Sequence, residues 1–304
     1  MKRSCILSTL LFTTLAFSGT SHAKDDITIP DGPYLGQTPP GSVPEVFAPG
    51  IINRDESADL QGMFGLDMNT FYFSRTGEEY AGVVTVGEFK GNKTNYGLAV
   101  VEYKDNKWQH SVFAKAVGDA SISPDGNTIM LKTGYMERTS DGWSEVKSLG
   151  KPFASISIMR SAIAANGTIY FDTYSKAMDI PLRYSRLVNG KYETPKSLGP
   201  QFGVGRYTAH PYIAPDESYI VFDSVRDTGQ GRSDIYVSFR AADGSWGPAL
   251  NLGDKINTEA SEKGPSVTPD GKFLFFDRRV KRGNDDVTMY WVSTEIIEEL
   301  RSKQ

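Results

Sequence analysis

Polar and apolar positions recur along the chain in one order: a polar turn, then a short and nearly continuous apolar run. The copies are "GLDMNTFYFSR" (65–75), "SPDGNTIMLKT" (123–133), "AANGTIYFDTY" (164–174), "APDESYIVFDS" (214–224) and "TPDGKFLFFDR" (268–278). Pro, Asp, Asn and Gly suit a tight reversal of the backbone. The β-branched and aromatic residues that follow are typical of a strand buried on both faces. The pattern therefore predicts five copies of a strand, a tight turn and a second, buried strand.

A second phrase follows four of these units. It reads "EYKDNKWQH" (102–110), "RTSDGWSEVKSLG" (138–150), "LVNGKYETPKSLG" (187–199) and "RAADGSWGPALNLG" (240–253). Each copy combines Asp or Asn with Gly or Asn and then Trp or Tyr, which predicts a hairpin turn and an aromatic that packs on the adjacent unit. One full unit is therefore two hairpins, or four strands.

The spacing of the units predicts the architecture. Counted at Thr70, Thr128, Thr168, Tyr219 and Phe273, the steps are 58, 40, 51 and 54 residues. Four-stranded units at this period are typical of an all-β fold, the β-propeller. Five blades are expected; a sixth would have to lie in the 58-residue step, where residues 78–95 contain no turn unit and are interpreted as an elongated connection.

The last unit predicts how the ring closes. After "VTMYWVS" (287–293) the chain continues as "TEIIEELRSKQ", which offers a short helix and no fourth strand. The segment "PEVFAPGIIN" (44–53) resembles "PALNLGDKIN" (248–257), so the N-terminal strand is expected to complete the C-terminal blade and remove its exposed edges. Residues 44–304 then form one propeller domain, preceded by an extended lead-in at 24–43.

The first residues predict export. Lys2 and Arg3 precede an apolar run and the small residues Ser21 and Ala23, a pattern typical of a secretory signal peptide at 1–23. The predicted location is the periplasm or the outside of the cell. The apolar run is too short for a membrane span. Cys5, the single cysteine, lies in this segment, so neither disulfides nor thiolate chemistry are expected in the mature chain.

Charge narrows the choice of partner. Without Lys2 and Arg3 the chain carries 31 basic and 37 acidic residues, a net charge of about −6. This balance argues against a general nucleic-acid binder. A monomer without a cofactor, bound to a protein partner or an acidic oligosaccharide, is expected.

The repeats resemble a known family. "SPDGNTIML", "TPDGKFLFF", "SVRDTGQGRSDIYVSFR" (224–240) and "SWGPALNLGDKINT" (245–258) are similar to repeats of the TolB-type, WD40-like propellers of exported bacterial proteins, over residues 44–293. The resemblance implies a fold. It implies no single function, since such repeats serve binding proteins, protease accessory domains and polysaccharide-degrading enzymes. TolB itself has an additional N-terminal α/β domain for which the residues ahead of these repeats leave no room.

Candidate site residues are expected on one face, because loops over a rigid scaffold carry most functions. In a propeller, the loops leading into the innermost strands share a face with the loops between the second and third strands. The first set contributes Gln61, Asp119, Arg160, Tyr207, His210, Glu262 and Lys263, and the second contributes Arg75, Tyr174, Lys176, Arg226, Arg232, Arg278, Arg279, Lys281 and Arg282. Arg groups suit carboxylate and sulfate oxygens, so this face is expected to bind an anionic ligand; the alternative is that these are solvated loop charges.

An enzyme is the competing interpretation. A glycoside hydrolase needs two carboxyl groups across the channel, for which Asp119 and Glu262 are the candidates. A hydrolase or a polysaccharide lyase would work in the channel with these two residues, His210 and Arg160. Motifs of serine hydrolases and zinc proteases are missing from the sequence. One channel-facing histidine cannot build a multi-histidine metal site, so no metal is expected.

Overall fold

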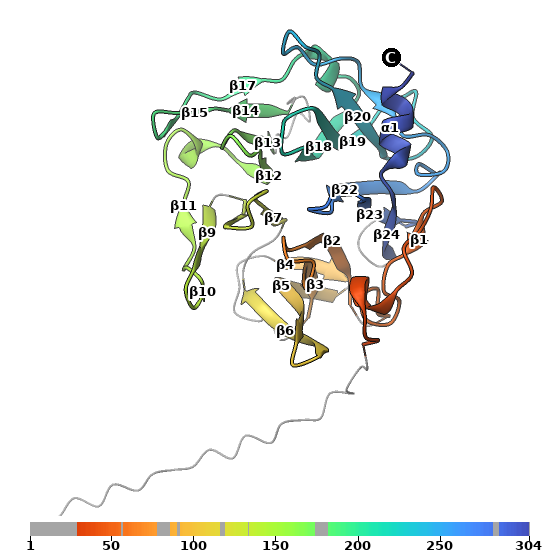
Figure 1. The fold of residues 1–304 in the computed structure, drawn as a ribbon. Helices are drawn as coiled ribbons and strands as arrows, with labels where there is room; N and C mark the ends of the chain where they lie inside the picture. Colours follow the sequence, from red (N-terminus) through yellow and green to blue (C-terminus); the bar gives the residue numbers. More distant parts are fainter. Residues whose placement is uncertain are drawn as a thin grey trace, which may run out of the picture.

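The computed structural model describes residues 29–55, 57–77, 86–89, 92–115, 119–132, 134–173, 182–281 and 286–303. The predicted signal peptide and the candidate residues Tyr174, Lys176 and Arg282 lie outside these ranges. Within them, the chain is a five-bladed β-propeller of four-stranded antiparallel sheets, as the repeats predicted (Figure 1).

Each blade runs from an inner strand beside the axis to an outer strand at the rim. Blade 1 contains β2 (Asp59–Phe64), β3 (Thr70–Thr76), β5 (Asn92–Lys104) and β6 (Lys107–Lys115). Blade 2 contains β7 (Ser121–Ile122), β8 (Thr128–Met130), β9 (Gly134–Thr139) and β11 (Lys147–Ser148), with β10 (Gly142–Trp143) also paired to β9. Blade 3 contains β12 (Ile158–Ile163), β13 (Ile169–Thr173), β14 (Arg183–Ser185) and β17 (Lys196–Ser197), with a side hairpin of β15 (Leu187–Val188) and β16 (Lys191–Tyr192).

The last two blades complete the ring. Blade 4 contains β18 (Tyr207–Ile213), β19 (Tyr219–Val225), β20 (Asp234–Phe239) and β21 (Leu250–Asn251). Blade 5 contains β22 (Ser261–Val267), β23 (Phe273–Arg279), β24 (Val287–Ser293) and β1 (Glu45–Val46), followed by helix α1 (Glu295–Arg301). In the 78–95 connection, β4 (Val86–Phe89) pairs with the first residues of β5 as a hairpin; residues 78–85 and 90–91 lie outside the description.

The N-terminal strand closes the ring, as predicted. Glu45 pairs with Trp291 and Val46 with Tyr290, and Figure 1 shows β1 beside β24 although they lie at opposite ends of the sequence. Asn53 joins the same two segments, because its Nδ2 donates to the Phe47 carbonyl over 2.8 Å and its Oδ1 accepts from the Met289 amide over 2.6 Å.

The turns use their polar residues locally. Carboxylates of Asp125, Asp216 and Asp270 each accept a hydrogen bond from the amide two residues further on. Asp234 accepts from the amides of Gln230 and Gly231, within its own blade. These residues therefore have the structural roles that turn chemistry predicts.

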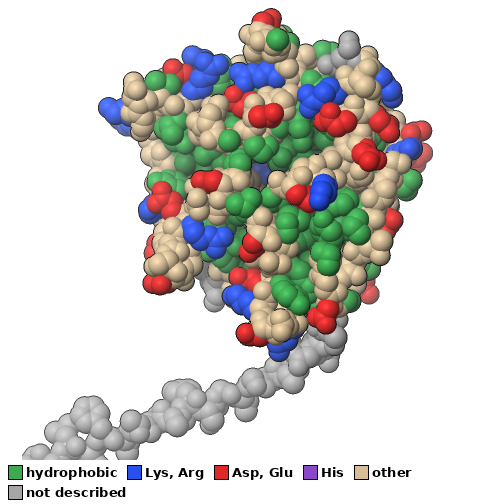
Figure 2. All heavy atoms as spheres, in the orientation of Figure 1, with side chains coloured by type: hydrophobic (Ala, Val, Ile, Leu, Met, Phe, Trp, Pro, Cys, Tyr) green, Lys and Arg blue, Asp and Glu red, His purple; other side chains and the backbone are tan. Residues whose placement is uncertain are grey.

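Apolar clusters fill the junctions between blades. The second strands supply their centres: Phe71, Phe171, Phe222 and Phe275 are at most 1% exposed. On the face shown in Figure 2, apolar side chains form patches around the centre, while most charged side chains lie toward the edge. Burial of the apolar clusters between blades is the main force that holds neighbouring blades together.

Most junctions are covered on the outside by an aromatic from the hairpin phrase. Trp143 covers the junction of blades 1 and 2, Trp246 that of blades 3 and 4, and Trp108 that of blades 5 and 1. At the junction of blades 4 and 5, Ile296 and Ile297 of α1 cover the core instead. The predicted packing of each hairpin aromatic on the adjacent unit is therefore confirmed. No helix among the described residues is long and apolar enough to cross a membrane.

Candidate ligand site at the channel mouth

The inner strands share an irregularity that shapes the channel. In β2, β12, β18 and β22 the pairing with the second strand shifts register after the first, second or third residue of the strand. Gln61, His210 and Gly264 lie at these bulges with φ of 54°, 50° and 62°. Bulges re-aim side chains, and here Gln61 and His210 both line the cavity described below.

Three buried aspartates hold the bulges in place. Asp277 accepts from the Gln61 amide over 3.1 Å, Asp172 from the His210 amide over 2.7 Å, and Asp223 from the Gly264 amide over 3.1 Å. Each bond joins the second strand of one blade to the inner strand of the next. In blades 1 and 2 the equivalent positions are Ser74 and Lys132. The repeated "FD" of "IYFDT", "IVFDS" and "LFFDR" marks these three aspartates and is the sequence signal that locates them.

The charged groups beside the axis are buried close together, and their pKa values are shifted as a result. Burial raises the pKa of Asp277 to about 7 and also raises the pKa of Asp172. His210 Nδ1 lies 2.6 Å from Asp223 Oδ1. Burial alone would lower the pKa of His210, but the charge of Asp223 and this hydrogen bond raise it above its ordinary value. His210 therefore holds its proton more tightly than a free imidazole does.

Arg160 lies beneath this level, 1% exposed. Burial lowers the pKa of its guanidinium, and the nearby charges are those of Asp119, Asp277, Asp172 and Asp223. Nε and Nη1 have no hydrogen-bond partner among the described residues, and the same holds for the side-chain oxygen of Gln61. Both groups border Gly264, where an added Cβ would lie 3.1 Å from Gln61 Cγ and 3.6 Å from Arg160 Nη1.

Beside Gln61, and so close to Arg160, a cavity of about 290 Å³ opens at the channel mouth. Its lining comes from the starts of inner strands and the ends of second strands, as the sequence predicted for this face. The lining residues are Leu60, Gln61, Ser74, Tyr96, Asp119, Lys132, Tyr207, His210, Lys263 and Arg279. Lys263 Nζ lies 5.1 Å from the centre of the Tyr207 ring, a cation–π contact.

The structure thus brings together seven of the nominated residues: Gln61, Asp119, Tyr207, His210, Lys263 and Arg279 in the cavity lining, and the buried Arg160 beside it. Lys132 was not nominated from the sequence, because the turn units give no signal for a lysine at that position. Arg279 belonged to the predicted face and lies in the lining.

Four other nominated residues are engaged inside the blades, outside the cavity lining. Glu262 is fully buried and pairs with Arg278 over 2.8 Å, and the Arg278 guanidinium lies over the Tyr290 ring. Arg75 pairs with Asp59 over 2.6 Å. Arg226 lies over the Tyr236 ring and donates to the Gln201 carbonyl. Asp119 and Glu262 therefore do not face one another as two carboxyl groups free to act on a ligand.

The described residues contain no candidate metal site. Among the described residues, no three His, Cys, Asp or Glu side chains are grouped so that they could hold a metal ion.

Comparison with solved structures returns propellers of diverse activity. TolB from Acinetobacter baumannii has 14% identity and a TM-score of 0.44; the match covers 77% of this chain and 54% of TolB, so the chain spans about half of its length. A gluconolactonase from Xanthomonas campestris has 10% identity and a TM-score of 0.45, covering 86% of this chain and 98% of the enzyme. An α-L-arabinofuranosidase from Podospora anserina has 10% identity and a TM-score of 0.46, covering 84% and 94%.

No protein-family model and no curated protein matches the sequence. The propeller assignment therefore rests on the chain's own sheets, and at these identities the solved structures indicate nothing about its activity.

Proposed function

We propose that the protein is an exported, non-catalytic recognition propeller that binds an anionic ligand, such as an acidic oligosaccharide, at the channel mouth. The observation that carries this proposal is the convergence of cations from different blades on one cavity. Lys132 comes from blade 2, His210 from blade 4, and Lys263 and Arg279 from blade 5. Arg160 of blade 3 adds a buried charge beneath them.

Asp223 forms an ion pair with His210, so the positive charge offered at the mouth comes mainly from Lys132, Lys263 and Arg279. Asp172, Asp223 and Asp277 are buried below the cavity and accept hydrogen bonds from backbone amides. Among the described residues of the cavity lining, the one acidic residue is Asp119, whose carboxylate lies 4.0 Å from Lys132 Nζ. A ligand at the mouth therefore meets mainly positive charge, which favours carboxylate or sulfate groups.

The remaining lining suits a sugar ring. Tyr207 and Tyr96 supply aromatic surface, and Gln61 and Ser74 supply groups that hydrogen-bond to hydroxyls. The volume of about 290 Å³ is near the lower limit for small-molecule sites, so one or two sugar units of a longer chain would fit.

One observation favours a catalytic alternative, a polysaccharide lyase. The contact of His210 with Asp223 orients the imidazole as in many acid and base catalysts. The raised pKa of His210 argues against this reading, because Asp223 favours the protonated imidazole over the neutral form that a general base needs.

A thermal-shift screen of residues 24–304 tests the proposal. Oligosaccharides of uronic acids are compared with their neutral counterparts, and mass spectrometry of the same samples detects cleavage. We expect acidic oligosaccharides to raise the melting temperature without cleavage, because a ligand that binds the folded state stabilises it. The Lys263→Gln, Arg279→Gln double variant should lose the shift, whereas Lys272→Gln, in an exposed turn, should keep it. Cleaved product would establish the enzyme instead, and a shift that survives the double variant would refute the site.

A further inference from the structure

The junction of blades 2 and 3 is covered differently from the others. Its hairpin phrase, "NGKYE", has Tyr192 where the other three hairpins have Trp108, Trp143 and Trp246. Tyr192 packs against Phe153, with ring centres 5.2 Å apart, beside the buried cluster of this junction. The smaller ring covers less of the core than a tryptophan would.

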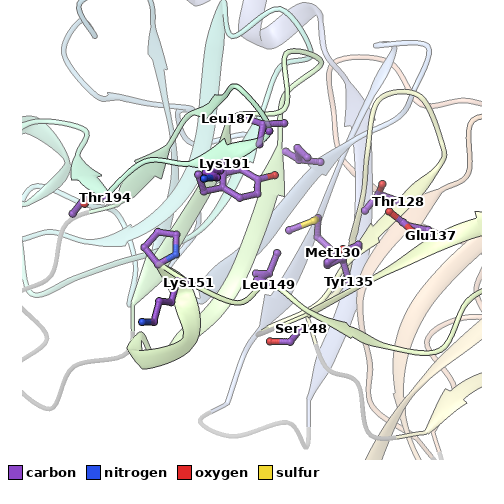
Figure 3. A pocket seen from close by; sticks show the side chains of 14 residues that line it. Thr128, Met130, Tyr135, Glu137, Ser148, Leu149, Lys151, Leu187, Lys191 and Thr194 are labelled. Atoms are coloured by element: carbon purple, nitrogen blue, oxygen red, sulfur yellow. The ribbon is translucent and has the colours of Figure 1, made fainter.

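A cavity of about 620 Å³ lies at this junction. Met130, Leu149 and Ile163 form its apolar base, and Tyr135 and Tyr192 form part of its walls. Leu187 of the β15–β16 hairpin overhangs it and is 42% exposed. Figure 3 shows Met130, Tyr135 and Leu149 together in the cavity, with Leu187 and Lys191 on the side of the hairpin.

The rim of this cavity carries positive charge. Glu137 pairs with Lys147, which neutralises the acidic residue of the lining. Lys151 and Lys191 also line the cavity and are exposed, and among the described residues neither forms a salt bridge. Hydroxyl groups of Thr128, Ser148 and Thr194 complete the polar part.

We propose that this cavity is a second binding site, separate from the channel, for a small amphipathic anion with an aromatic or aliphatic body and a carboxylate or sulfonate head. The volume falls within the range of small-molecule sites, which are mostly apolar with a few polar groups that orient the ligand. The apolar body lies on Met130, Leu149 and Ile163, and the head reaches Lys151 and Lys191. Burial of the body supplies affinity, and the two lysines select the charge of the head.

Anilinonaphthalene sulfonate is a suitable probe, because it combines an aromatic body with an anionic head. Its fluorescence is followed in a titration of residues 24–304, with naphthoate as a competing carboxylate and naphthyl methanol as its neutral analogue. We expect saturable binding at this site and competition by naphthoate that exceeds that of the alcohol by about tenfold. Near-ultraviolet circular dichroism of each sample confirms native packing, since this dye also binds partly folded chains.

Two variants test the position of the site. Tyr192→Trp restores the larger ring of the other hairpins and should fill the cavity, so that affinity falls by about tenfold or more while the protein stays folded. Lys151→Gln with Lys191→Gln should remove the preference for naphthoate over the alcohol. Lys196→Gln, on the neighbouring β17, should change nothing, and neither should the channel double variant.

Absence of saturable binding to the wild type would overturn the proposal. Binding that survives both Tyr192→Trp and the double lysine variant would do the same, because the dye would then lie elsewhere. Equal competition by naphthoate and the alcohol would overturn the proposal that the site selects an anionic head group. The cavity would then be an apolar pocket without charge selectivity.

Discussion

Asp277 is a single residue whose titration affects the whole fold. Its carboxyl is buried, accepts from the Gln61 amide, and has a pKa of about 7 instead of 3.8. Because the folded chain holds this proton more tightly than the unfolded chain, its contribution to stability is present at low pH and is lost as the pH rises from about 4 to about 7. Between pH 5 and pH 8 the wild type should lose roughly 2 kcal/mol from this group.

Asp277→Asn isolates that effect. The amide keeps an oxygen for the Gln61 amide but does not titrate, so its stability relative to the wild type should improve by roughly 2 kcal/mol between pH 5 and pH 8. Urea unfolding at both pH values measures the difference. Asp243→Asn, in an exposed turn, should show no such trend, and a pH-independent difference for Asp277→Asn would contradict the assignment.

Arg160 is a buried positive charge near the carboxylates of Asp277, Asp172 and Asp223. Arg160→Met should lower stability at pH 8 by about 3 kcal/mol or more, because buried negative charges would lose their compensation. The loss should be smaller at pH 5, where Asp277 and Asp172 bind protons more readily. Urea unfolding of Arg160→Met is compared with that of Arg206→Met, whose exposed pair with Asp227 contributes little. Equal losses at the two pH values would refute the electrostatic account.

The sequence predicted the positions of the candidate residues on the fold well, but it did not predict which groups their side chains contact. Tyr207, His210 and Lys263 line the cavity because they begin inner strands, which the repeats locate. Arg75, Arg226 and Arg278 end second strands on the same face, yet aromatic rings and carboxylates inside the blades hold them. Such contacts join residues from strands distant in the sequence, so the repeat alone does not reveal them.

At the scale of the element, α1 covers the core at the junction where blade 5 has no aromatic hairpin. Blade 5 has no aromatic phrase, and Ile296 and Ile297 of α1 cover the junction of blades 4 and 5. Ile297→Ala should therefore cost about 2 to 4 kcal/mol of stability, as in other apolar cores. Chemical denaturation measures this cost. Glu299→Ala, on the exposed face of the same helix, should cost less than about 0.5 kcal/mol, and equal effects of the two would show that the helix does not cover the core.

The second strands were the most predictable elements and the outer strands the least. A second strand has a turn before it and several buried residues within it, so its pattern is strong. Outer strands such as β11, β17 and β21 are two residues long; β11 and β17 are exposed and β21 is half-buried. They pair only because the preceding strand offers an edge, and two residues carry no periodicity from which to predict them.

At the scale of the molecule, stability depends on the closure of the ring between the two ends of the chain. β1 adds only two residue pairs to β24, so this short ladder alone is a weak closure. Asn53 reinforces it, because its side chain bonds to the backbone of both Phe47 and Met289. Phe47 also packs on Trp291 and Phe275, with ring centres 5.2 and 4.8 Å away.

Asn53→Gly should therefore weaken the whole propeller, although the change lies in a loop. Gly accepts the φ of 62° found there, so the loss reflects the missing hydrogen bonds, about 2 kcal/mol at roughly 1 kcal/mol for each. Asn53→Ala should cost about 1 kcal/mol more because of its strained backbone. Urea unfolding measures both variants. Limited proteolysis should cut the N-terminal segment first, because loss of the β1–β24 pairing releases this segment and leaves β24 as an unpaired edge.

Asn189→Gly, also at positive φ in the exposed β15–β16 turn, is the matched control and should keep the wild-type stability and cleavage pattern. Unchanged unfolding of Asn53→Gly would mean that core packing around Phe47 closes the ring without the Asn53 bonds.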